Sequence, residues 1–102
     1  MIAIQVFGET YLIVIDKIKG NVLGLCDPLH CTITLHSDLL DNEDHLWRIL
    51  RHELGHAFLF ETGLAETLNT REQEMLAQLF GNFLQLFDKP PFIANIIAEA
   101  KR

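Results

Sequence analysis

The sequence predicts a small α+β domain, in which an N-terminal sheet of three or four strands, antiparallel or mixed, packs on a central helix. A second helix and a short C-terminal helix complete it. The first 36 residues contain short runs of β-branched and aromatic residues, whereas apolar residues recur at helical spacing from about residue 43 onwards. With 102 residues, of which 49% are hydrophobic, the chain supports a single domain with one core, residues 1–102.

The first strands are predicted to form a hairpin followed by a third short strand. Residues 2–7 and 11–15 are rich in β-branched and aromatic side chains, and Gly8 opens the short break between them. Residues 22–26 are largely apolar and follow a Gly-Asn turn signal. These segments therefore supply three strands of the expected sheet.

The next segment, residues 31–36, alternates in polarity. Its apolar positions are Ile33 and Leu35, and its polar positions are Thr32, Thr34 and His36. This pattern is typical of a half-exposed strand, and we expect it at an edge of the sheet. Because an edge strand can pair with an extended peptide through its main chain, Thr32, Thr34 and His36 are candidates for substrate contacts.

Three helices are predicted downstream, and each has a boundary signal. The first runs from about residue 43 to about 61, after the capping candidates Asp41 and Asn42. The second extends from about residue 70 to about 87, and large apolar residues at helical spacing mark its expected inward face. A proline pair ends it, and a short amphipathic helix over residues 92–100 completes the chain.

Charge and composition limit the classes of binding partner and the cellular compartment that we expect. The net charge of −6 argues against a nucleic acid or an anionic membrane surface as the main partner. Residues 1–15 are apolar but interrupted by polar residues and lack a basic region, so we expect neither a signal peptide nor a membrane span, and a cytoplasmic protein. Cys26 and Cys31 are expected to be reduced thiols; a disulfide or part of a zinc site are the alternatives.

The motif His52-Glu53-Leu54-Gly55-His56 carries the chemistry. Positions i and i+4 lie on one face of a helix, so His52 and His56 can bind one metal ion. Glu53 is rotated by about 100° from His52, which suits a general base beside the metal. Buried imidazoles and a carboxylate need a compensating charge, and a zinc ion supplies one. The alternative is a metal-free buried helix with two hydrogen-bonded histidines.

Gly55, inside this motif, is itself informative. A glycine in the middle of a helix is less favourable than alanine by about 1 kcal/mol. We therefore expect that a strand, a substrate or the metal passes close to this position.

A catalytic zinc usually has three protein ligands, and no histidine follows His56. A downstream carboxylate is therefore expected as the third ligand. The candidates are Glu61, Glu66, Glu72, Glu74, Asp88 and Glu99. Helical phase favours Glu72, because the positions on its face of the second helix are apolar, and Glu74 on a more polar face is the fallback. As an alternative, Glu72 completes a capping box with Asn69.

Between roughly residues 20 and 87 the chain resembles the ImmA/IrrE-like zinc metallopeptidases of phages and mobile elements. The resemblance is carried by a Gly-Leu-Cys-Asp turn, the alternating Ile33/Leu35 strand, the Trp47-x-x-Leu50-x-His52-Glu53-Leu54-Gly55-His56 helix, and Glu72-x-x-x-Leu76-Ala77. It implies a minimal zincin-like fold, with His52, His56 and Glu72 as zinc ligands and Glu53 as the base.

The motif and the resemblance together lead to the hypothesis of a gluzincin-type zinc metallopeptidase that hydrolyses a peptide bond in a protein substrate. The resemblance implies a phage or mobile-element repressor as that substrate. The alternative is a non-catalytic zinc-binding module, in which the metal stabilises a small core and the function is protein recognition. Glu53 favours the enzyme, because a structural zinc site has no use for a base.

Overall fold

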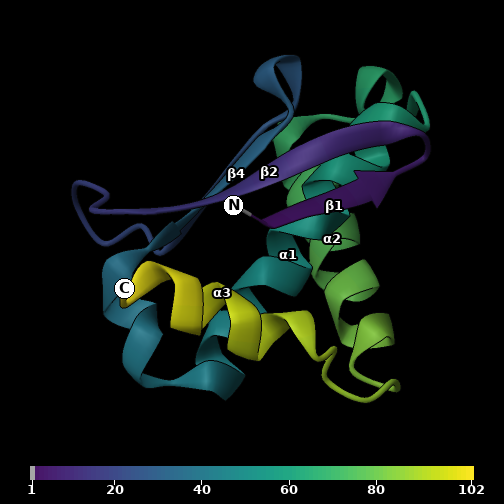
Figure 1. Ribbon diagram of the computed structural model, residues 1–102. Helices are drawn as coiled ribbons and strands as arrows, with labels where there is room; N and C mark the ends of the chain where they lie inside the picture. Colours follow the sequence, from purple (N-terminus) through teal and green to yellow (C-terminus); the bar gives the residue numbers. More distant parts are fainter. Residues whose placement is uncertain (1) are drawn as a thin grey trace.

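The computed structural model describes residues 2–102 and has an α+β fold, with a four-stranded mixed sheet and three α-helices in that range (Figure 1). The strands are β1 (Ile2–Val6), β2 (Glu9–Asp16), β3 (Gly24–Asp27) and β4 (Thr32–His36), and the helices are α1 (Glu43–Glu61), α2 (Thr70–Leu84) and α3 (Phe92–Ala100). Three short 3-10 helices, η1 (Pro28–His30), η2 (Ser37–Asp41) and η3 (Leu64–Thr67), lie in the connections. The predicted fold class is confirmed. Within residues 2–102, no helix combines the length and apolar character that crossing a membrane requires.

The strand order of the sheet is β1-β2-β4-β3. β1 and β2 form the predicted antiparallel hairpin, joined by a turn in which Phe7 and Gly8 have positive φ angles of 49° and 87°. β4 runs parallel to β2, with Ile33 opposite Ile13, and it pairs antiparallel with β3 on its other side. β1 and β3 are therefore the edge strands.

The prediction that residues 31–36 form an edge strand was wrong. β4 is paired along both sides, so Thr32, Thr34 and His36 offer no free main-chain edge to a substrate. Their polarity has a different cause: the buried Ile33 and Leu35 face the helices, and the other face of the strand is half exposed. Alternation of polar and apolar residues indicates which face of a strand is exposed to solvent, but it does not indicate whether the strand lies at an edge of the sheet.

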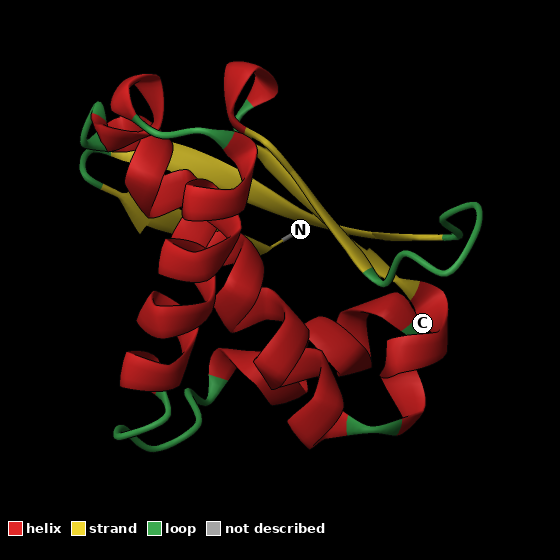
Figure 2. Cartoon of the chain, turned by 180° about the vertical axis from the view of Figure 1, so that it is seen from behind, coloured by secondary structure: helices red, strands yellow, loops and turns green. Residues whose placement is uncertain are grey.

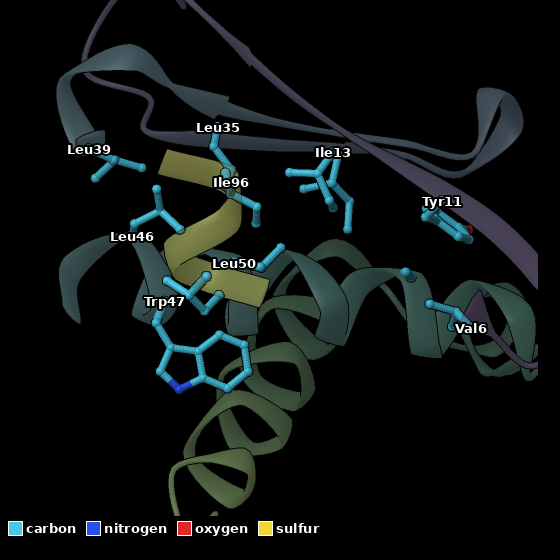
Figure 3. Packing of buried hydrophobic residues seen from close by; sticks show 12 residues of the cluster. Val6, Tyr11, Ile13, Leu35, Leu39, Leu46, Trp47, Leu50 and Ile96 are labelled. Atoms are coloured by element: carbon cyan, nitrogen blue, oxygen red, sulfur yellow. The ribbon is translucent and has the colours of Figure 1, made fainter. Parts of the chain in front are cut away.

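The helices lie on one side of the sheet (Figure 2), with α1 packed against the sheet and α2 packed against α1. The core fills the space between the sheet and α1, where fully buried Leu35, Leu46 and Leu50 meet Ile13 and Ile96 (Figure 3). Burying one such side chain contributes about 1.5 to 3 kcal/mol. α1 is thus held on two sides, which makes it the central helix that the sequence predicts.

Caps set the ends of α1 at the predicted residues. The Asn42 side chain accepts a hydrogen bond from the His45 N–H at 3.0 Å, and the acidic Glu43 and Asp44 occupy the first turn, where the helix dipole favours negative charge. At the other end, the Tyr11 hydroxyl of β2 donates to the Glu61 carboxylate at 2.7 Å. This bond fixes the C-terminal end of α1 to the sheet.

α2 packs on α1 through small residues. Ala77 and Gly81 are its buried residues, and a Cβ atom built on Gly55 of α1 would lie 2.7 Å from both the Cα and the carbonyl oxygen of Ala77. The two helix backbones therefore come very close together. The close approach predicted at Gly55 is confirmed, but the neighbour is α2, which the prediction did not include.

The predicted inward face of α2 was wrong. The exposed fractions of Met75, Leu79 and Phe83 are 56%, 59% and 55%, so the large apolar residues that defined this face point mainly to solvent. The contact at Gly55 leaves room only for small side chains on the face toward α1, and the large ones are turned away. α2 also ends at Leu84, earlier than expected.

The helix contact can be tested with Gly55→Ala. Its methyl group would overlap backbone atoms of Ala77, which move only if the helices separate, so we expect the free energy of unfolding to fall by about 1 to 3 kcal/mol. Gly81→Ala is the matched control: its nearest neighbours would lie at 3.5 Å, an ordinary contact, and its helix propensity should raise stability by up to about 1 kcal/mol. Chemical denaturation measures both changes. Equal stabilisation by the two substitutions would contradict the close approach.

Candidate metal centre

α1 and α2 bring two imidazoles and a carboxylate together. His52 and His56 lie one turn apart on α1, with their ring centroids 5.0 Å from each other. From α2, the Glu74 Oε2 lies 3.0 Å from the His52 Nε2, and its Oε1 lies 2.9 Å from the His56 Nε2. One ligand atom from each residue falls within 4.8 Å of the others. This group could hold a metal ion.

The hydrogen-bond partners of His52 indicate that a cation fits between its ring and Glu74. The Gln78 Oε1 lies 3.1 Å from its Nδ1, and the Glu74 Oε2 lies 3.0 Å from its Nε2, so both ring nitrogens face an acceptor. A neutral imidazole has only one N–H. With the Nδ1–H donating to Gln78, the Nε2 lone pair faces a carboxylate, and this is favourable only with a proton or a metal ion at Nε2. Imidazole and carboxylate donors suit zinc and related divalent metals.

Gln78 is a residue that sequence reasoning missed. Its Nε2 donates to the Asn82 Oδ1 at 3.0 Å, which turns its Oε1 toward His52. Such a partner fixes the orientation and tautomer of a ligating histidine. The available signal was its position four residues after Glu74, on the same face of α2.

The structure groups Glu74 with the two histidines and places Glu72, the expected third ligand, in a capping box. The Glu72 N–H donates to the Asn69 Oδ1 at 2.9 Å, and the Glu72 carboxylate accepts from the Asn69 N–H at 3.0 Å. This is the capping box that was the alternative role for Glu72. Glu74, two residues or about 200° further around the helix, faces the histidines instead. The difference follows from the orientation of α2, whose buried residues are Ala77 and Gly81.

Glu53 is held beneath the edge strand β3. It is 8% exposed, and a Cβ atom on Gly24 of β3 would lie 3.1 Å from its Cγ and 3.2 Å from its Oε2. A side chain at this position would press on Glu53, and its Cβ atom would lie 2.7 Å from the Ile49 Cγ2. Burial raises the pKa of Glu53 to about 7, while the nearby His52 lowers it and the charge of Glu74 raises it. Glu53 is therefore positioned as a proton acceptor that titrates near neutral pH.

His56 is suited to bind a cation. Burial lowers its pKa, an effect that His52 reinforces and the adjacent Glu74 carboxylate opposes. A lowered pKa favours the neutral ring, which is the form that ligates metals. His56 can thus donate its Nε2 lone pair near neutral pH without first losing a proton.

The three candidate ligands and Glu53 line one cavity of about 480 Å³. Gly24, Leu25 and Cys26 of β3 form part of its wall. Cys26 was not predicted at the site; burial raises the pKa of its thiol to about 12, so it is a neutral thiol near pH 7. The cavity is large enough for more than an ion, and it brings the free strand edge, Glu53 and the histidines together.

Measurements of zinc affinity distinguish the roles of Glu72 and Glu74, the two glutamates of α2. Glu74→Gln removes a charged oxygen from the group and should weaken Zn²⁺ affinity by at least about tenfold, because loss of outer partners alone has effects of that size. Glu72→Gln is the matched control and should leave affinity unchanged, since glutamine serves equally well in a capping box. Competition titration against a chromophoric chelator measures both constants. The reverse ranking would place the third ligand at Glu72 after all.

The raised pKa of Glu53 predicts a pH-dependent stability of the metal-free protein. Between about pH 4.5 and 7 the folded state holds a proton on Glu53 that the unfolded state has lost, so the contribution of this group to stability falls as the pH rises through that window. The loss amounts to at most about 3 kcal/mol. Glu53→Gln should remove this component, and the stability difference between wild type and variant across the pH series isolates it from His56. A difference independent of pH would contradict the raised pKa.

Comparisons with known proteins leave the site to be judged on its own geometry. No model of a known family matches the chain, and neither the curated proteins nor the solved structures provide a match. The resemblance to the ImmA/IrrE-like peptidases thus stays an expectation from the motifs. The candidate metal centre rests on the arrangement of His52, His56 and Glu74 across α1 and α2.

Proposed function

We propose that this protein is a zinc-dependent metallopeptidase that hydrolyses a peptide bond in a protein substrate. The observation that carries the proposal is the position of Glu53, a buried carboxyl group in the same cavity as the His52, His56 and Glu74 group. A metal site that only stabilises the fold has no use for such a group. An enzyme that activates water requires one.

The residues divide the chemistry among them. His52, His56 and Glu74 would hold the zinc ion, which supplies a Lewis acid that polarises the peptide carbonyl and acidifies water. Glu53 accepts the proton of the attacking water and passes it to the leaving amine. A dication at the histidines favours the ionised carboxylate, so Glu53 would be charged and able to accept a proton at neutral pH.

Strand β3 supports an extended peptide as the substrate. It pairs with β4 along one side and is an edge strand of the sheet, and Gly24, Leu25 and Cys26 line the cavity that contains Glu53. A peptide that adds to this edge through main-chain hydrogen bonds would run past the candidate metal centre. β3 thus takes the substrate-binding role that was expected of residues 31–36.

The decisive experiment compares the wild type with Glu53→Gln. Both should bind one zinc ion per chain, whereas cleavage of a peptide library, followed by mass spectrometry, should fall by about 10²-fold or more in the variant, because an amide cannot accept the proton. Glu66→Gln, an exposed glutamate of η3 that does not line the cavity, is the control and should cleave normally.

The same assay distinguishes the alternative function. A zinc-loaded wild type that leaves the library uncut, while wild type and Glu53→Gln bind the same protein partners, would favour the non-catalytic recognition module. Equal cleavage by both proteins would remove Glu53 from the mechanism and leave the metal group without its base.

A further inference from the structure

A second cavity, of about 610 Å³, lies beside the N-terminal half of α1 and shares no lining residue with the metal centre. Arg48 and Arg51 of α1 line it, one turn apart, together with His45 and Gln85. Residues three positions apart on a helix are neighbours. Two positively charged side chains therefore face the same open space.

Arg51 is the unusual member of this pair. The residue is only 8% exposed, and its Nε is buried with no hydrogen-bond partner among residues 2–102. Its guanidinium lies over the ring of Trp47, 5.4 Å from the centroid, which offsets part of the loss of water. A buried N–H donor without a partner is nevertheless unfavourable, and native proteins seldom leave such a donor unsatisfied.

Neighbouring acidic residues do not neutralise the positive charges of Arg48 and Arg51. Within residues 2–102 neither Arg48 nor Arg51 forms an ion pair with a carboxylate. The acid that lines the cavity, Asp44, is bound by the Lys89 ammonium at 2.8 Å. In a chain with 14 acidic and 8 basic residues, two adjacent arginines without an acid point to a partner outside the chain.

We propose that this cavity binds a phosphate group, held by the guanidinium groups of Arg51 and Arg48. The planar guanidinium presents a fork of N–H donors that matches the oxygens of an oxyanion. Two positive charges favour a doubly charged phosphate over a singly charged carboxylate. His45 and Gln85 line the same cavity and add further polar groups. This proposal does not depend on the peptidase function.

The test measures phosphate binding by the full chain, made metal-free with a solid-phase chelator so that the histidine site does not contribute. Isothermal titration with inorganic phosphate, with phosphoserine and with acetate, all at one ionic strength, separates free phosphate, a phosphate ester and a carboxylate. We expect phosphate or phosphoserine to bind at least about tenfold more tightly than acetate. The tighter of the two identifies a free or an esterified phosphate as the natural ligand.

Two substitutions locate the site. Arg51→Met keeps an unbranched apolar side chain over Trp47 and should weaken phosphate binding by at least about tenfold, as should Arg48→Met on the exposed side of the cavity. Arg71→Met, an exposed arginine of α2 that does not line the cavity, is the control and should bind as the wild type does.

Unchanged affinity in folded Arg51→Met or Arg48→Met overturns the assignment, as does a wild type that binds phosphate no better than acetate. Because Arg48 is exposed, its substitution leaves the core intact and decides the question even if Arg51→Met does not fold.

Discussion

The close approach of α1 and α2 at Gly55 and Ala77 is the constraint on which the site depends. Gly55 lies between the two histidines of its helix, and Ala77 lies one turn after Glu74 on the other. Because the backbones touch at this point, the short glutamate side chain spans the gap and contacts both imidazoles. A larger residue at either position would move the carboxylate away from its partners, and the three ligand atoms would no longer surround one point.

Local sequence signals were sufficient to predict the bounds of α1 and the helix face that carries its two histidines. A capping asparagine, acidic residues in the first turn and an apolar pattern gave the bounds of the helix, and fixed i, i+4 spacing placed His52 and His56 on one face. Such signals could not predict which face of α2 is buried. Large apolar residues usually mark the buried face of a helix, but here the buried face is built from Ala77 and Gly81, whose small size carries almost no hydrophobic pattern.

The sheet shows the same limit at longer range. The strands could be predicted from their composition, but their order in the sheet depends on pairings between segments far apart in the chain. β4 lies between β2 and β3. The environment of Glu53 depends on that order as well. Burial raises its pKa, and Gly24 of β3, 29 positions earlier in the chain, is one of the residues packed beside it, a contact that no local pattern predicts.

The placement of Trp47 gives the protein a built-in optical reporter. It is the only tryptophan in the chain, it is buried on α1, and the ring of Phe92 from α3 meets it edge-on at 6.4 Å. The Arg51 guanidinium lies over its ring. Indole emission therefore responds to the docking of α3 and to charge changes in the arginine cavity. Trp47 lines the arginine cavity and does not line the cavity of the metal centre, so its emission follows the arginine cavity and the docking of α3 more closely than events at the histidines.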